Sequence, residues 1–314
     1  MELKVFTPDE LGVVLRALRS VALCNDQFTD AERALVQGVA RIHEVAIDAD
    51  ALEPLSFAEV ARILVDPHRR KRAVQLAIVT ALVEGTPSAA TERAVRELAS
   101  ELGLDEAGLD VLYEVAQGHA LLARFDMFRR VSRFIRNAKT FPGIRKLAFP
   151  MLGIGGADED LAASYRALGS CARGTLGRAF HDHFVENAFK FPGELGGLAM
   201  TFHDLGHVLS GYGTDPQSEI QQAAFQAGYA RRDGFSFLLF GILQFHLGMR
   251  VTPVAKGERG LFDVPLVLTA LHRGASCKVD LSEGFDIFAH KDRSLAEVRA
   301  ELGIPPLEPM AKAS

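Results

Sequence analysis

This sequence contains few cysteines, and they lie far apart along the chain. Cys24, Cys171 and Cys277 are the three cysteines among 314 residues, and none belongs to a C-x-x-C pair. The sequence therefore argues against a disulfide framework and against a thiolate zinc site. We expect reduced thiols that are mostly buried.

The sequence also lacks segments typical of export or of membrane insertion. Its start, MELKVFTPDELG, has no basic beginning or apolar core, and it carries acids that transit peptides avoid. The most apolar stretch, FSFLLFGILQFHLG at 235–248, is shorter than the roughly 20 residues of a bilayer-spanning helix. We expect a cytoplasmic protein in which this stretch is a buried helix or the wall of an apolar cavity.

The overall composition is that of a globular protein. Hydrophobic residues make up 48% of the chain and charged residues 24%, which allows a sizeable core. The net charge of -5 argues against general binding of nucleic acid. Strand patterns are scarce, whereas apolar residues recur at three- and four-residue intervals in the stretches at 11–23, 30–42, 57–65, 72–85, 91–103 and 107–122. The sequence therefore predicts an all-α fold.

A faint duplication marks the N-terminal third. The stretch TDAERALVQGVARI, from Thr29, matches AATERAVRELASEL, from Ala89, and keeps Glu, Arg and Ala in step. Two weak copies suggest a domain of paired helices without establishing a repeat.

The segment at about 8–118 resembles the TerB-like domains of tellurite-resistance proteins. In those domains an acidic turn lies between helices, and NDQFTDAE at 25–32 occupies that place here. Asp26, Asp30 and Glu32 are candidates for cation binding. The alternative is that they cap the start of the following helix, where negative charge is favoured.

Basic charge is concentrated in one segment, RFDMFRRVSRFIRNAKTFPGIRK at 124–146. It holds eight Lys or Arg and one acid. Phe125, Phe128, Val131 and Ile135 fall near one side of a helix, which gives the profile of a helix that binds anionic membrane surfaces. The alternative is an interdomain helix with a solvated basic face. The aromatic residues look like a buried stripe, which disfavours stacking on nucleic acid.

One short motif carries the strongest chemical signal. On a helix, His203 and His207 lie about 40° apart and Asp204 about 100° from His203, so all three can face one cavity. The sequence GYGTDP at 211–216 predicts that this helix ends and another begins. Glu219 falls in the first turn of the new helix, and a tight corner can return it to the histidines.

The donor set of this motif suits a divalent metal. Two imidazoles with one or two carboxylates fit zinc, and also iron, manganese or cobalt. Three protein ligands would leave an open, catalytic position, whereas four would close the site. The alternative is a polar cluster without metal, but such a group of ionisable side chains is costly to bury without a counter-ion.

The same motif resembles the signature of the Coq-four family of coenzyme Q (ubiquinone) biosynthesis proteins. The resemblance covers about 125–314. It rests on H-D-x-x-H, eleven residues and E (His203, Asp204, His207, Glu219), on HVLSGYGTDPQSEI from 207, on GTLGRAF at 174–180 and on SLAEVRAELGI at 294–304.

This resemblance implies a helical fold, a zinc-type site formed by those four residues and a hydrophobic channel for a polyprenyl tail. It implies a peripheral membrane protein that oxidatively removes the C1 carboxylate of a prenylated hydroxybenzoate and leaves a hydroxyl. We therefore expect a TerB-like domain at 1–118, a basic helix or linker at 119–146 and a metal- and lipid-binding domain at 147–314. Partners would be a prenylated quinone precursor, an anionic membrane, proteins of a quinone-biosynthesis complex and further copies of this chain.

Residues outside the motif are weaker candidates for contact with the bound molecule. Arg178 has the planar fork that suits a carboxylate or phosphate. His183, in FHDHFVEN at 180–187, is either part of a polar helix face or a proton-transfer group. His246 lies in the apolar stretch and is either a hydrogen-bonded core residue or a channel residue. Gly206 stands where the family has a bulky residue, which suggests a wider pocket or another substrate.

Two other functions compete with a quinone-biosynthesis enzyme. An HD-type phosphohydrolase would bind metal through His203 and Asp204, with His181 or His183 as the upstream histidine. A non-catalytic scaffold that binds prenyl lipids would use the metal for structure only.

Overall fold

A computed structural model describes residues 1–137, 158–197, 201–252 and 255–307. Over these ranges the regular elements are helices, and no strand or sheet is found. The all-α fold predicted from the sequence is confirmed. The α-helices are α1 (Pro8–Ala22), α2 (Asp30–Ile42), α3 (Phe57–Ile63), α4 (Pro67–Leu82), α5 (Ala89–Glu101), α6 (Gly108–Ala116), α7 (Ala120–Asn137), α9 (Glu159–Arg166), α10 (Leu176–Glu186), α11 (Thr201–Ser210), α12 (Pro216–Tyr229), α13 (Phe235–Phe245), α14 (Val264–Ala275), α15 (Ile287–His290) and α16 (Leu295–Glu301).

Local capping signals fix where many of these helices begin. Thr7 caps α1 in a capping box with Glu10, and Asp215 accepts hydrogen bonds from the first backbone amides of α12. The acidic turn at the start of α2 also forms a capping box, between Thr29 and Glu32. Glu32 accepts a hydrogen bond from the backbone N–H of Thr29 at 2.9 Å, and Asp30 pairs with Arg33. Capping therefore accounts for Glu32, whereas cation binding by Asp26, Asp30 and Glu32 stays a prediction.

The helical run predicted over 107–122 is interrupted. Helix α6 ends at Ala116, and Gly118 adopts a left-handed conformation with φ of 74° before α7 begins at Ala120. Glycine adopts this conformation without a steric penalty, which explains why the periodic pattern breaks at this position.

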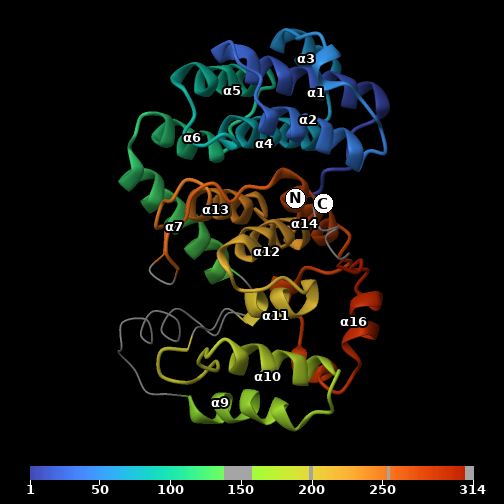
Figure 1. The fold of residues 1–314 in the computed structure, drawn as a ribbon, viewed down its shortest axis with the longest axis vertical. Coiled ribbons are helices and arrows are strands. Elements are labelled where there is room, and N and C mark those ends of the chain that lie inside the picture. The colour runs from blue at the N-terminus through green and yellow to red at the C-terminus, as the bar shows by residue number, and fades with distance from the viewer. Residues whose placement is uncertain (138–157, 198–200, 253–254, 308–314) are drawn as a thin grey trace, which may run out of the picture.

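The helices form layers along the long axis of the molecule (Figure 1). Helices α1 to α6 make the upper layer, while α12, α13 and α14 make the middle layer beside α7. Helix α11 packs on α12 and on α10, which lies in the lower layer next to α9. The upper layer meets the middle one where α2 packs on α14 and α4 on α13. Because one connected buried core includes residues from all these layers, the domain boundaries at 118 and 146 stay a prediction.

The stretch predicted to be a buried helix or cavity wall forms α13, which is almost wholly buried. Its residues pack against α12, the helix that carries Glu219. No helix in the described ranges is long and apolar enough to cross a membrane.

The apolar residues that the sequence places along the basic helix, α7, differ in their exposure. Val131 is buried in the core, whereas Phe125 and Phe128 are 66% and 45% exposed. Of the apolar residues that the sequence places near one side of this helix, Phe125 and Phe128 are therefore exposed, whereas Val131 faces the neighbouring helices. The side chain of Ile135 and the rest of the basic segment, 138–146, lie outside the described residues.

Candidate metal centre

Helices α11 and α12 form the predicted corner. His203 and His207 lie one turn apart on α11, and Glu219 lies in the first turn of α12. The chain reverses between them through residues 211–215, so the start of α12 returns to the histidine face of α11. His207 is buried, while His203 and Glu219 have side chains that are 26% and 21% exposed.

The three side chains converge on one point. The Nε2 atoms of His203 and His207 are 3.2 Å apart. Each of these atoms lies 3.6 Å from an oxygen of Glu219, Oε2 for His203 and Oε1 for His207. One donor atom from each residue can be chosen so that all lie within 4.8 Å of one another. Donors around a tetrahedral zinc with bonds of 2.0–2.2 Å would be about 3.3–3.6 Å apart, so these residues fit a divalent ion.

Hydrogen bonds to the far ring nitrogens orient both imidazoles. His203 Nδ1 lies 3.0 Å from Oε1 of Gln226, and His207 Nδ1 lies 3.2 Å from the backbone carbonyl oxygen of Tyr212. Each Nδ1–H therefore donates to an oxygen, which turns Nε2 toward the shared point. Metal-ligating histidines are commonly held in this way.

The sequence reasoning missed Gln226. It follows Glu219 by seven residues on α12, a spacing that places both side chains on the same helix face. That spacing is the signal that would have found it.

The charges of the site also favour a cation. Burial lowers the pKa of His203, but its hydrogen bond with Glu219 and the charges of Glu219 and Asp204 outweigh burial and raise that pKa to about 9. Burial and the neighbouring charge of His203 lower the pKa of His207 to about 3. Near neutral pH His203 of the metal-free site thus carries an additional proton on Nε2, which pairs it with Glu219, beside a neutral His207. A divalent ion would replace this proton.

Asp204, the predicted fourth ligand, is directed toward α10 instead of the common point. Its Oδ1 atom lies 3.7 Å from Nε2 of His183. The His183 ring stacks on His207 with centroids 5.5 Å apart, and its buried Nε2 has no hydrogen-bond partner in the described part of the chain. The structure thus gathers three of the four predicted ligands, and coordination by Asp204 stays a prediction.

Two arginines hold the end of α11. Arg299 of α16 donates to the carbonyl oxygens of Leu209 and Val208 at 2.9 and 2.8 Å, and Arg273 of α14 donates to that of Ser210 at 2.9 Å. The last carbonyls of a helix lack partners within it and carry partial negative charge, so arginines there are stabilising. They fix the helix that carries both histidines.

Gly206 does not widen the pocket. A Cβ atom at this position would collide with the side-chain amide of Gln222, which fills the space between α11 and α12. The amide oxygen of Gln222 accepts a hydrogen bond from the hydroxyl of Ser210 at 2.9 Å. The absence of a side chain at Gly206 therefore lets the two helices that carry the site approach closely.

The remaining candidates are engaged elsewhere. Arg178 pairs with Asp182 through Nε, at 2.7 and 2.9 Å from its two oxygens, and His181 contacts the same carboxylate. Nε2 of His246 donates to the carbonyl oxygen of Val83 at 2.9 Å, and its Nδ1 accepts from a backbone N–H. His246 is thus a hydrogen-bonded residue at the contact of α13 with the N-terminal helices. Contact of Arg178, His183 or His246 with a bound molecule stays a prediction.

Comparison with known proteins adds no assignment: no protein-family model matches this chain, and no curated protein gives a significant match. The resemblance to the Coq-four family therefore rests on the sequence motifs.

Proposed function

We propose that this protein is a metal-dependent enzyme of prenyl-quinone biosynthesis. Its substrate would be a prenylated hydroxybenzoate, from which the C1 carboxylate is removed and replaced by a hydroxyl. The observation that carries the proposal is the convergence of His203, His207 and Glu219 on one point. Three protein ligands leave a coordination position for substrate, which is typical of catalytic sites.

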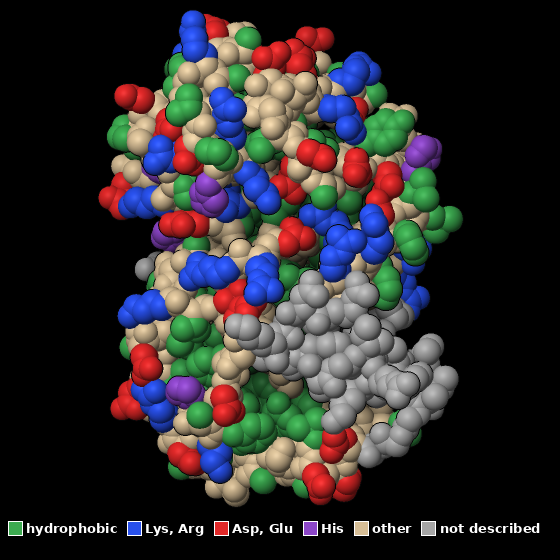
Figure 2. Space-filling view, turned by 180° about the vertical axis from the view of Figure 1, so that it is seen from behind, with side chains coloured by type: hydrophobic (Ala, Val, Ile, Leu, Met, Phe, Trp, Pro, Cys, Tyr) green, Lys and Arg blue, Asp and Glu red, His purple; other side chains and the backbone are tan. Residues whose placement is uncertain are grey.

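An aromatic cavity beside α11 supports a ring-shaped substrate. It has a volume of about 180 Å³ and is lined by residues of α9, α10, α11 and α15, among them Tyr165, Phe180, Phe202 and Phe288. A cavity of about 150 Å³ is enough for a benzene ring. Figure 2 shows hydrophobic side chains lining a hollow in the same lower half of the molecule. Because Phe202 precedes His203, the cavity and the metal centre share one helix.

In the proposed reaction the bond between ring and carboxylate breaks and carbon dioxide leaves. Dioxygen accepts two electrons and becomes hydrogen peroxide, and water supplies the hydroxyl oxygen and its proton. A bound divalent ion would stabilise negative charge on the carboxylate or phenolate oxygens. His207 is neutral near pH 7 because of its lowered pKa, so it is available as a ligand. Glu219 would balance the charge of the ion.

Membrane binding is part of the proposal, and the exposed face of α7 supports it. Leu121, Leu122, Phe125 and Phe128 project from two turns with exposures of 75%, 54%, 66% and 45%. Arg129, which pairs with Asp126 at 2.8 Å, follows on the same helix. Figure 2 shows basic and hydrophobic side chains together along the edge where α7 runs. This combination suits an anionic lipid surface, to which apolar side chains and basic charge both contribute.

Activity of the metal-loaded protein tests this function. Wild-type protein and the Glu219→Gln variant would be incubated with a prenylated hydroxybenzoate in air, and carbon dioxide and the hydroxylated ring measured by mass spectrometry. We expect both products in equal amounts from the wild type and none from the variant. If the folded, metal-loaded wild type yields neither product, the proposal fails. If the variant loses metal and also unfolds, the scaffold alternative is favoured.

One observation favours a second candidate, an HD-type phosphohydrolase. His183 lies beside both Asp204 and His207, where that class needs its upstream histidine. Release of phosphate from nucleotides by the metal-loaded protein would support this function. The quinone-biosynthesis enzyme should release none.

A further inference from the structure

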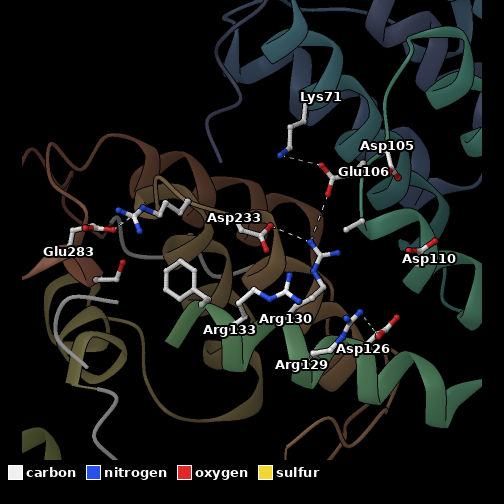
Figure 3. Close-up of a pocket in the computed structure, with 14 residues that line it drawn as sticks. Lys71, Asp105, Glu106, Asp110, Asp126, Arg129, Arg130, Arg133, Asp233 and Glu283 are labelled. Atoms are coloured by element: carbon white, nitrogen blue, oxygen red, sulfur yellow. Dashed lines mark hydrogen bonds and ion pairs between the residues drawn. The ribbon is translucent and has the colours of Figure 1, made fainter. Parts of the chain in front are cut away.

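A second polar cavity lies where the N-terminal helices meet α7 and the C-terminal part of the chain. Its volume is about 330 Å³, and its walls come from α4, α6, α7 and the segments near residues 105, 232 and 282 (Figure 3). None of His203, His207 and Glu219 lines it. The volume is at the lower end of the roughly 300–1,000 Å³ that small-molecule sites occupy.

Three arginines of α7, Arg129, Arg130 and Arg133, extend into this cavity (Figure 3). Arg129 is neutralised by Asp126 at 2.8 Å. Arg133 differs, since no carboxylate is paired with it within the part of the chain that the structure describes. An exposed cation that faces a cavity without a partner is available to a ligand.

Arg130 is the buried member of the set, with 9% of its side chain exposed. Its Nη2 atom lies 3.2 Å from Asp233, and its Nε donates to the hydroxyl of Ser236 at 3.2 Å. Its Nη1 atom is buried and has no hydrogen-bond partner among the described residues. A buried charged donor without an acceptor is costly, so an oxygen atom is expected next to it.

Most acidic side chains on the cavity walls are paired with basic side chains, and the others lie toward the N-terminal helices. Glu106 is shared by Lys71 at 3.6 Å and Arg130 at 3.8 Å. Asp105 and Asp110, which come from the loop before α6 and from α6, are exposed (Figure 3). Their charge disfavours a ligand with several anionic groups, whereas Phe134 offers an apolar surface next to Arg133.

We propose that this cavity binds a small molecule with a single oxyanion group, phosphate or carboxylate. Arg133 and Arg130 hold that group, with Nη1 of Arg130 as the buried donor, and the remainder of the molecule lies against Phe134. The site is separate from the metal centre and does not depend on the function proposed for it.

Isothermal titration calorimetry of the full chain with inorganic phosphate and with acetate tests this site. We expect saturable binding of at least one anion with Kd near or below about 1 mM. Arg133→Gln should weaken it about tenfold or more, the effect of losing one charge-assisted hydrogen bond. The anion with the lower Kd shows whether the site prefers a phosphate or a carboxylate group.

Two variants keep this test specific. Arg173→Gln removes an equal charge at an exposed position outside the cavity and should change Kd less than about twofold, because distant charges are screened. Glu219→Gln alters the metal centre and should leave Kd unchanged. The proposal is overturned if neither anion binds at about 10 mM, ten times the expected Kd. It is also overturned if Arg133→Gln matches Arg173→Gln, or if Glu219→Gln abolishes binding.

Discussion

Gln226 accepts a hydrogen bond from Nδ1 of His203 at 3.0 Å and thereby directs the opposite nitrogen toward Glu219 and His207. This contact joins α11 to α12 and makes the orientation of one proposed ligand depend on a side chain of the other helix. The candidate metal centre is therefore a property of the packed helix pair and not of α11 alone.

Replacing Gln226 with Leu should weaken zinc binding about 10–100-fold, because loss of the partner of a ligating histidine has effects of this size. The measurement is competition with a chromogenic chelator. Gln221→Leu is a matched control, since Gln221 lies on the same helix and its side chain donates to the backbone carbonyl oxygen of Gln217. Equal affinities of the two variants would show that Gln226 does not position His203.

Glu219→Gln removes the charge of the third ligand while keeping its shape. Zinc affinity should fall by more than the about 10–100-fold expected for an orienting residue, because a neutral amide is a poor zinc ligand. Elemental analysis after dialysis should find about one zinc per wild-type chain and much less in the variant. Glu186→Gln, which changes an exposed carboxylate of α10, should retain the wild-type content. Full zinc occupancy in Glu219→Gln would contradict the assignment.

Metal affinity should depend on pH through His203. Its pKa in the metal-free protein is raised to about 9, so below this pH a proton occupies the nitrogen that must bind metal. Zinc affinity should therefore rise about tenfold per pH unit from neutrality to about 9 and then level off. Titrations in buffers with different ionisation heats would show release of one proton per zinc near pH 7. An affinity that is constant over this range would rule out the proposed protonation state.

Replacing Arg299 with Met removes two hydrogen bonds to the last carbonyls of α11. We expect a loss of about 1–2 kcal/mol in the free energy of unfolding, measured by urea denaturation, because hydrogen bonds from charged donors are stronger than neutral ones. Arg293→Met removes an exposed ion pair with Glu301 and should cost less. If the two variants are equally stable, Arg299 does not hold α11.

Removing apolar side chains from the exposed face of α7 should weaken membrane binding. Phe125→Ser should lower the affinity for vesicles that contain phosphatidylserine about tenfold, since an exposed phenylalanine gains over 1 kcal/mol on burial. Sedimentation with vesicles gives the bound fraction. Val65→Ser changes a residue that is similarly exposed, at 67%, in the N-terminal layer and should have no effect. Equal binding by both variants, or equal binding to uncharged vesicles, would contradict membrane docking through α7.

Much of the fold could be predicted because its signals are local. Helical spacing and the caps at Thr7, Thr29 and Asp215 depend on residues only a few positions apart. The corner between α11 and α12 was predictable for the same reason. The outward face of α7 could not be predicted, because the pattern shows that Phe125 and Val131 are apolar but does not show which of them neighbouring helices cover.

The site could be predicted only as far as one helix pair determines it. The spacing of His203, His207 and Glu219 identified the three residues that converge. The direction of Asp204 depends on α10, which brings His183 beside it, and the support of α11 comes from Arg299, some ninety residues along the chain. Such contacts arise from packing between distant segments and leave no trace in local periodicity.

The most direct test of the account is a crystal of the zinc-loaded protein measured at the zinc absorption edge. The account predicts one anomalous peak about 2.0–2.2 Å from Nε2 of His203, Nε2 of His207 and a carboxylate oxygen of Glu219. Zinc bound elsewhere on the chain, with no peak between these three side chains, would contradict it.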